Sequence, residues 1–313
     1  KPKKLRIGFV SGDLWEHPVG YVLLGVLENL KNKDLELIAY SNFSKKDNLN
    51  IKLKSCFDIW HEIGNQKDVE VINLIRKDKI NILFDLSGHT EKNRLSVFVS
   101  KPAPVQISWG GYPGSIGIPE IDYIIGDPYV TPQKENKYFT EKVIILPNIW
   151  ICFTPPAFEL KIEEPPVTKN KYITFGSFNN LSKINSEVVN LWSKILKAVP
   201  GSKIFLKSNV LNDLYFKKLI IENFKKNNID LNSIILEGRT SRKEYFSSYN
   251  KIDIALDPFP YSGGITTFES IWMGVPVLTK KGNNRFVSHQ TESINYNSGM
   301  NDWIAKDEEE YLF

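Results

Sequence analysis

Short apolar segments of strand length alternate with longer amphipathic segments along almost the whole chain, and this alternation limits the fold more than any other feature. Residues 5–11, 35–41 and 80–86 (LRIGFVS, LELIAYS and INILFDL) are compact and apolar. Between them, residues 21–30 and 68–78 repeat apolar side chains at intervals of three and four, as an α-helix does. A strand–helix–strand rhythm is typical of a parallel sheet covered by helices. The sequence therefore predicts an α/β fold.

The rhythm is interrupted once, where two Pro-Pro pairs stand among charged residues without periodicity. We interpret this stretch, residues 156–171, as a linker between two Rossmann-like domains over 1–155 and 172–313. A surface loop inside one larger domain is the alternative. The length of 313 residues also fits two domains. Ligands of such sheets bind beyond the carboxyl ends of the strands, so we expect the site in a cleft between the domains.

Composition argues against several classes of protein. Lys and Arg number 40 against 36 Asp and Glu, and the basic residues are scattered, so we expect no nucleic-acid partner. Only Cys56 and Cys152 occur, without the spacing of a metal site or a disulfide scaffold, which favours a reducing compartment. No apolar run approaches the roughly 18 residues that span a bilayer. We therefore expect a cytoplasmic protein that crosses no membrane and needs neither a metal ion nor another cofactor.

The first candidate binding loop covers residues 175–187 (FGSFNNLSKINSE), between a predicted strand and a predicted helix. Its Asn-Ser pair can cap the helix, whose N-terminal N–H groups and partial positive charge attract an anion. Lys183, just before that helix, would add a full positive charge, and Asn179 and Asn180 offer amide groups. These residues favour a phosphate site, with an exposed surface role for Lys183 as the alternative.

The second candidate loop lies within residues 256–278 (LDPFPYSGGITTFESIWMGVPVL). A glycine pair allows a ligand to approach the main chain closely. Two threonines then place hydroxyl and N–H groups at a helix start, and a glutamate one turn later can accept hydrogen bonds from a ribose. The residues in question are Gly263, Gly264, Thr266, Thr267 and Glu269. A nucleotide-sugar diphosphate would use all of these groups, whereas a plain helix cap with an exposed glutamate is the alternative.

Two histidines follow predicted strands in the first half of the chain. His17 lies in SGDLWEHPVG and His89 in DLSGHTEKNR, both where a strand ends. Histidine titrates near neutral pH and is suited to proton transfer, although either side chain could instead cap or pack its loop. A third loop, residues 109–123, is rich in glycine and could form a tight backbone wall beside a ligand or a simple cluster of turns. Dinucleotide, P-loop, nucleophile-elbow and Asp-x-Asp motifs are absent.

Taken together, the stretches GDLWEHPVGY, DLSGHTEKNRL, FGSFNNLSKI and DIALDPFPYSGGITTFESIWMGVPV resemble the catalytic region of the protein O-linked N-acetylglucosamine transferase family, glycosyltransferase family 41, including its SPINDLY branch. The resemblance implies a GT-B architecture, in which two Rossmann-like domains with parallel sheets face a central cleft. It also implies that the second domain holds most of the donor and that no metal is needed.

The resemblance further implies roles for individual residues. Lys183 would meet the diphosphate, with Asn180 beside it, and would act in catalysis together with His17 and His89. The phosphates would bind Thr266 and Thr267, and the ribose Glu269 or its neighbour Ser270. The remaining donor contacts would come from the sugar-pocket wall at Gly111 and Tyr112 and from the base-binding residues Arg242 and Tyr245.

The function implied by the resemblance is transfer of N-acetylglucosamine from UDP-N-acetylglucosamine to Ser or Thr hydroxyls of an acceptor protein. Ile265 and Tyr245 stand where the N-acetylglucosamine branch has histidines. The stretches FGSFNNL and PFPYSGG look closer to the SPINDLY branch, some of whose members transfer fucose from GDP-fucose. Protein O-fucosyl transfer is therefore an alternative. A sugar-nucleotide epimerase and a non-catalytic nucleotide-binding fragment are alternatives of other classes. We expect a truncated C-terminus, and tetratricopeptide repeats that this chain lacks but the full-length protein contains.

Overall fold

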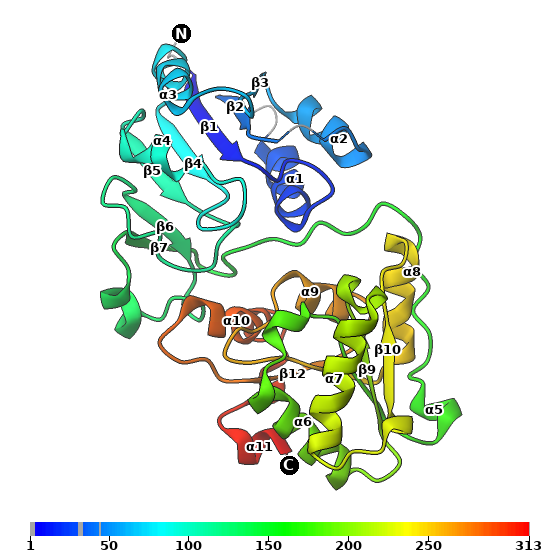
Figure 1. The fold of residues 1–313 in the computed structure, drawn as a ribbon. Helices are drawn as coiled ribbons and strands as arrows, with labels where there is room; N and C mark the ends of the chain where they lie inside the picture. Colours follow the sequence, from blue (N-terminus) through cyan, green and yellow to red (C-terminus); the bar gives the residue numbers. More distant parts are fainter. Residues whose placement is uncertain (1–3, 31–33, 44, 313) are drawn as a thin grey trace. The chain divides into compact units, whose positions relative to one another are not determined.

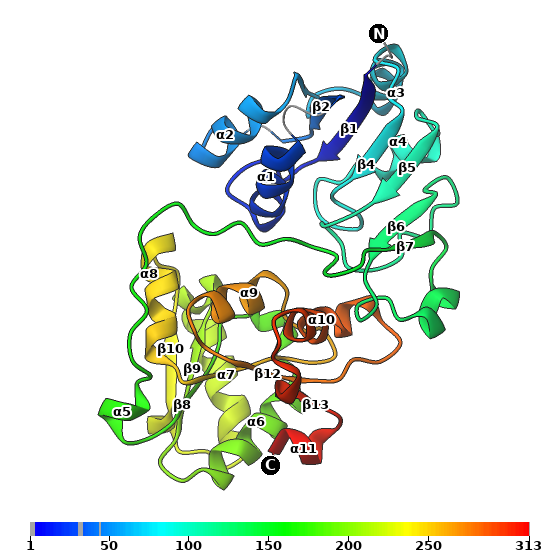
Figure 2. The same ribbon diagram turned by 180° about the vertical axis from the view of Figure 1, so that it is seen from behind.

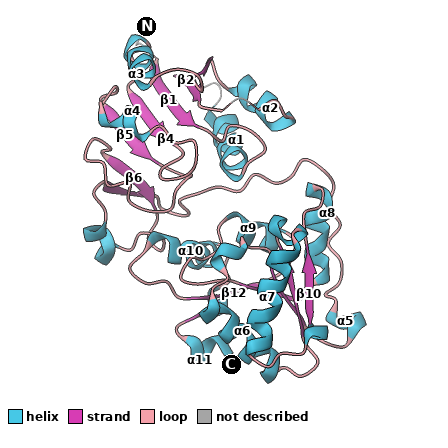
Figure 3. Ribbon diagram, viewed as in Figure 1, coloured by secondary structure: helices cyan, strands magenta, loops and turns pink. Residues whose placement is uncertain are grey.

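The computed structural model describes residues 4–30, 34–43 and 45–312 and divides into two compact units. Unit 1 comprises Lys1–Pro155 and unit 2 comprises Pro156–Phe313. Each unit contains one sheet, and every strand pair in both sheets is parallel (Figures 1 and 3). The predicted α/β fold of the GT-B type, with two parallel sheets, is confirmed.

The sheet of unit 1 has the strand order β3-β2-β1-β4-β5-β6-β7. The strands are β1 (Leu5–Ser11), β2 (Leu35–Ser41), β3 (Ile59–Glu62), β4 (Ile82–Asp85), β5 (Val105–Ser108), β6 (Tyr123–Gly126) and β7 (Lys142–Ile145). The helices are α1 (Pro18–Leu30), α2 (Asn48–Cys56), α3 (Asp68–Lys77) and α4 (Leu95–Val99). The strand order changes direction between β1 and β4, which places the topological switch point of unit 1 there.

The sheet of unit 2 has the order β10-β9-β8-β11-β12-β13, and its switch point lies between β8 and β11. The strands are β8 (Thr174–Ser177), β9 (Lys203–Lys207), β10 (Ile234–Glu237), β11 (Ile254–Leu256), β12 (Val277–Lys280) and β13 (Ile304–Ala305); β8 and β13 are labelled in the reverse view of Figure 2. The helices are α5 (Val167–Asn170), α6 (Ser186–Ala198), α7 (Leu214–Lys226), α8 (Arg242–Ser247), α9 (Ile265–Trp272), α10 (Gln290–Asn297) and α11 (Glu308–Leu312).

The two switch points fall where the sequence predicted binding loops. In open parallel sheets, ligands bind at this position because the chains leaving the two central strands diverge and leave a crevice. In unit 1 these chains are the loops with His17 and His89, which follow β1 and β4. In unit 2 they are the loops with Lys183 and Gly263, which follow β8 and β11.

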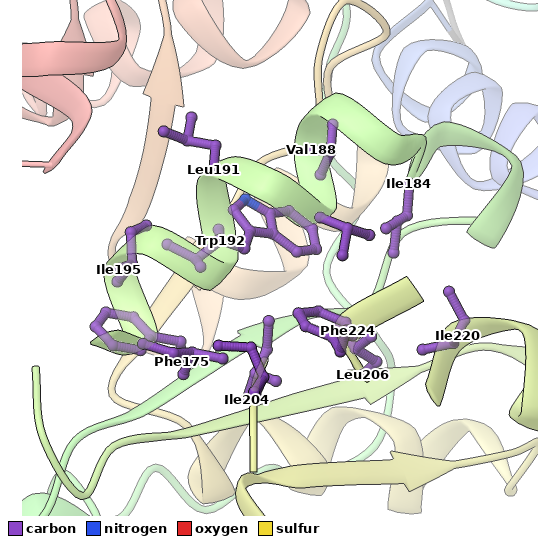
Figure 4. Packing of buried hydrophobic residues seen from close by; sticks show 14 of the residues in the cluster. Phe175, Ile184, Val188, Leu191, Trp192, Ile195, Ile204, Leu206, Ile220 and Phe224 are labelled. Atoms are coloured by element: carbon purple, nitrogen blue, oxygen red, sulfur yellow. The ribbon is translucent and has the colours of Figure 1, made fainter. Parts of the chain in front are cut away.

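Apolar side chains of α6 and α7 bury one face of the sheet of unit 2. Asn185 caps α6 by accepting a hydrogen bond from the Val188 N–H at 2.9 Å, as the sequence predicted. One turn further on, Trp192 is fully buried, and Figure 4 shows it on the face of α6 that points toward Ile204 of β9 and Phe224 of α7. This core fixes where α6 begins and therefore where the Lys183 loop ends.

The structure adds elements that the apolar pattern did not predict. The strands β3 and β7 have no fully buried residue, and they lie at the two edges of the sheet, so neither has a long apolar run. The predicted linker is not a bare connection, because it contains α5 and is hydrogen-bonded to unit 2, from the Val167 N–H to Asp253 Oδ1 at 2.9 Å. In the described part of the chain, every helix is too short or too polar to cross a bilayer.

Truncation of the core tryptophan should destabilise unit 2. We expect Trp192→Ala to lower the free energy of unfolding by about 3–5 kcal/mol, because it leaves a large cavity beneath α6. Denaturant titration followed by circular dichroism would measure the change. Ile51→Ala, which removes a side chain that is 63% exposed on α2, is the control and should change stability by less than about 0.5 kcal/mol. An equal effect of the two substitutions would contradict the assigned core.

Candidate functional site

Hydrogen bonds between the loops after β8 and β11 bring the predicted phosphate-binding groups of unit 2 together. Lys183 Nζ donates to the Ser262 carbonyl oxygen at 2.8 Å, and Thr266 Oγ1 donates to Asn179 Oδ1 at 3.1 Å. Asn185 Nδ2 also donates to the Phe259 carbonyl oxygen at 3.0 Å. Two segments that are about 80 residues apart in sequence therefore share one short network at the switch point.

Lys183 is the cation of this network. Its ammonium lies 3.9 Å from the centre of the Tyr261 ring as well as on the Ser262 carbonyl. Burial lowers the pKa of Lys183 to about 8, and the negative charge of Asp257 acts in the opposite direction. The side chain is thus partly buried and charged at neutral pH, in contrast to the solvated surface lysine that was the alternative.

The glycine pair lets the main chain approach the threonine hydroxyls. A Cβ atom on Gly263 would lie 2.5 Å from Thr267 Oγ1, 2.9 Å from Asp257 Oδ1 and 3.1 Å from Thr266 Oγ1, so no larger residue fits without displacing them. Gly264 is the N-cap of α9, whose first N–H groups have no partner within the helix. The site therefore combines an ammonium, a helix N-terminus and bare backbone, which is the chemistry that binds a diphosphate.

The threonines and asparagines of this network differ in what they can still offer a ligand. Thr266 is partly exposed, whereas Thr267 is buried, with its N–H bonded to the Gly264 carbonyl and its Oγ1 lying 2.9 Å from Thr291 Oγ1. Asn179 is buried against Thr266, and Asn180 is exposed and accepts a hydrogen bond from the Ser182 N–H. Contact of Thr267 or Asn180 with a ligand stays a prediction.

Glu269, Tyr245 and Arg242 form a second cluster beside this network. The Glu269 carboxylate is only 4% exposed, accepts a hydrogen bond from the Tyr245 hydroxyl at 2.9 Å, and lies 3.6 Å from Arg242 Nη2. Burial raises the pKa of Glu269 to about 7, with Arg242 and Tyr245 acting in the opposite direction. The residues predicted to bind the ribose and the base are thus in direct contact.

The histidine loops of unit 1 are also joined at their switch point, through the Gly12 N–H and Ser87 Oγ at 3.4 Å. His17 Nδ1 accepts a hydrogen bond from the Val19 N–H at 3.3 Å and lies 3.8 Å from Asp13 Oδ1. Burial lowers the pKa of His17, while Asp13 acts in the opposite direction. Because Nδ1 accepts a backbone hydrogen bond, neutral His17 carries its proton on Nε2.

His89 binds the glycine-rich loop of unit 1. Its Nε2 is 2.8 Å from the Ile116 carbonyl oxygen, and its ring meets Tyr112 edge-on at 5.2 Å between centres. A Cβ atom on Gly111 would lie only 1.9 Å from the Leu86 carbonyl oxygen, so the backbone itself requires glycine there. These contacts bring His89 and Tyr112 together, next to Gly111, and they show that His89 packs its loop.

The sequence analysis missed a pair of buried aspartates that hold these loops. Asp85 accepts hydrogen bonds from the N–H groups of Ser87 and Gly88, and Asp257 accepts one from the Gly263 N–H at 2.6 Å. Burial raises the pKa of each carboxyl to about 6. Both residues stand directly after the apolar core of a strand (ILFD and IALD), which marks their position at the sheet edge but not the N–H groups that they bind.

No three His, Cys, Asp or Glu side chains in residues 4–30, 34–43 and 45–312 are grouped so that they could hold a metal ion.

The buried glutamate should make stability depend on pH. The pKa of Glu269 is about 7 in the folded protein against 4.5 ordinarily. The carboxyl group therefore stabilises the folded protein fully below about pH 4.5, and this stabilisation is lost as the pH rises to about 7. Glu269→Gln removes this loss, so we expect the variant to be more stable than the parent at pH 8, by up to roughly 3 kcal/mol, and about equal at pH 4.5. Melting temperatures across this range would measure the difference. The opposite trend, with the advantage growing toward low pH, would contradict it.

Comparison with known proteins shows a family and relatives that match nearly the whole chain. The model of Glycosyl transferase family 41 matches residues 1–154 and 167–312. A relative from Solanum lycopersicum, described as probable UDP-N-acetylglucosamine–peptide N-acetylglucosaminyltransferase SPINDLY, is 33% identical over 319 residues, covering 99% of this chain and 34% of the relative. The chain thus spans about a third of the length of the curated relatives it matches.

Solved structures of glycosyltransferases are also similar to this chain. A mutant of the Thermobaculum terrenum O-GlcNAc transferase superposes with a TM-score of 0.95 at 34% identity, covering 99% of this chain and 59% of that one. A lipopolysaccharide outer core galactosyltransferase has a TM-score of 0.57 at 13% identity, covering 98% of this chain and 97% of its own. The second match supports the fold alone.

Proposed function

The chain belongs to glycosyl transferase family 41, as its motifs indicated, and on this basis we propose that it transfers N-acetylglucosamine from UDP-N-acetylglucosamine to Ser or Thr hydroxyls of proteins. The observation that carries the proposal is the network of Lys183, Gly263 and Thr266 at the switch point of unit 2. The names of the SPINDLY relative and of the Thermobaculum terrenum enzyme support the same sugar.

In the proposed reaction, the acceptor oxygen forms a bond to the anomeric carbon while the bond from that carbon to the diphosphate breaks. The hydroxyl proton passes from the acceptor to water, and the diphosphate leaves with an additional negative charge. We assign stabilisation of that charge to the Lys183 ammonium and the N-terminus of α9, which the small residue Gly263 leaves accessible to the diphosphate. These groups are held in place before the reaction, so little reorganisation is needed as charge develops.

Acceptor binding is assigned to the carboxyl edge of the sheet in unit 1. His17 is the side chain that we propose for orienting the acceptor hydroxyl, because its neutral form offers an Nε2–H donor. For His89, Gly111 and Tyr112 we propose a shared wall of the sugar pocket, held rigid by the His89 contact with Ile116.

The nucleotide is assigned to the cluster of Glu269, Tyr245 and Arg242. GDP-fucose is the less favoured donor, since the relatives compared above carry N-acetylglucosamine in their names. Titration calorimetry with UDP and GDP side by side tests this choice, and we expect tighter binding of UDP. Preferential binding of GDP would reject UDP-N-acetylglucosamine as the donor, and formation of an epimer from donor alone would favour the epimerase alternative.

Loss of the ammonium should abolish most of the activity. We expect Lys183→Ala to lower kcat by roughly 10² or more, as removal of an oxyanion-stabilising group does, with the fold intact by circular dichroism. Transfer of radiolabelled sugar to a peptide acceptor measures the rate. Lys194→Ala on α6, a lysine with one long ion pair to Glu308, is the matched control and should keep the parent rate. Near-parental transfer by Lys183→Ala would reject the assigned role.

We also propose a cytoplasmic location, consistent with the absence of a disulfide between Cys56 and Cys152. Tetratricopeptide repeats elsewhere in the full-length protein stay a prediction.

A further inference from the structure

A single peptide group in the loop after β11 is bound on both sides by opposite charges. The carbonyl oxygen of Ser262 accepts from Lys183 Nζ at 2.8 Å, and the N–H of the same peptide group, at Gly263, donates to Asp257 Oδ1 at 2.6 Å. The ammonium and the carboxylate are thus connected through one planar amide, whose orientation both of them fix.

Asp257 is itself held rigidly. It is 1% exposed, its Oδ2 accepts from Thr279 Oγ1 of β12 at 2.7 Å, and its carbonyl oxygen accepts from the Tyr311 hydroxyl of α11 at 3.3 Å. A buried carboxylate with both oxygens engaged cannot rotate without breaking a hydrogen bond. The position of the Gly263 N–H is therefore set by the sheet rather than by the loop.

From this arrangement we propose that Asp257 is a positioning residue for sugar transfer: through the Ser262–Gly263 peptide it holds the glycine loop in place and keeps the Lys183 ammonium charged beside it. The inference rests on the proposed function, in which Lys183 and the N-terminus of α9, directly after the glycine pair, meet the diphosphate. Asp257 does not itself reach the ligand, because Gly263 stands between them.

The charged and titratable groups around the pair are few. Lys183 faces the aromatic ring of Tyr261 and the charge of Asp257. Asp257 faces Lys183 and the hydroxyls of Thr279 on β12, Thr291 on α10 and Tyr311 on α11. The negative charge that favours the protonated form of Lys183 therefore comes from Asp257, so neutralising that one residue should lower the pKa of the lysine.

Asp257→Asn is the decisive variant, because asparagine keeps the shape and can still accept from the Gly263 N–H while losing the charge. The alkaline limb of the kcat/KM profile reports deprotonation of Lys183 in the free enzyme. We expect this limb to move to lower pH by roughly half a pH unit or more. At a pH well below that limb the rate should recover to within about threefold of the parent. Asp257→Ala, which also loses the anchor of the loop, should be slower by about tenfold or more at every pH, because a misplaced donor group cannot be restored by protonation.

Asp85→Asn is the matched control for the pH profile. Asp85 is equally buried at the switch point of unit 1, where its carboxylate interacts with His89. Whatever this substitution does to the rate, the alkaline limb should stay at the pH of the parent. The proposal would be overturned if the pH profile of Asp257→Asn superposed on that of the parent. It would also be overturned if the alkaline limb moved equally in Asp257→Asn and Asp85→Asn.

A second readout separates this inference from the proposed function. The rate at which an amine-reactive acylating reagent labels Lys183, followed by mass spectrometry against pH, reports the pKa of the lysine without any turnover. We expect Asp257→Asn to shift this curve to lower pH and Asp85→Asn to leave it unchanged. If the parent protein transferred no sugar but Asp257→Asn still shifted the labelling curve of Lys183, the proposed function would fail and the coupling of Asp257 to Lys183 would stand. A labelling curve that Asp257→Asn left unshifted would reject the coupling itself.

Discussion

Parallel pairing sends the carboxyl ends of all strands to the same edge of a sheet, and both halves of this protein depend on that constraint. Each loop that leaves the edge has backbone N–H groups that the sheet no longer satisfies. At the two switch points, buried aspartates accept these groups, Asp85 in unit 1 and Asp257 in unit 2. The loops that carry the candidate site are thus anchored to the sheet by carboxylates on its central strands.

The anchors are alike, but the groups gathered around them differ. Unit 2 places an ammonium and a helix N-terminus beside its aspartate, which favours an anionic ligand. Unit 1 places a histidine of lowered pKa and an aromatic ring there, which favours hydrogen bonding to a neutral group. This asymmetry agrees with a division of labour in which unit 2 holds the charged donor and unit 1 the hydroxyl acceptor.

The strands were predictable to within about two residues wherever a segment was largely buried, as β1 and β2 are. The edge strands β3 and β7 were missed because β3 has only two adjacent apolar residues and the short apolar run of β7 leads directly into Pro147 and Asn148. In the site, Lys183 and Thr266 could be placed from sequence because they stand at helix starts. Asp257 could not, since nothing local shows that its carboxylate meets a glycine six residues later. Strand order decides which loops become neighbours, and no single segment encodes it.

The neighbourhood of Glu269 explains how a buried acid could remain available to a ligand. Tyr245 donates to Oε2 and Arg242 lies nearest to Oε1, so each oxygen faces one donor. A carboxylate has about four lone-pair positions, and one donor on each oxygen leaves room for vicinal hydroxyls. The Tyr245 hydroxyl thus occupies one of the two positions on Oε2. Burial makes the negative charge of Glu269 unfavourable and so raises the pKa of this residue to about 7. Hydroxyl donors from a ribose would favour the ionised form, so ligand binding and ionisation of Glu269 should reinforce each other.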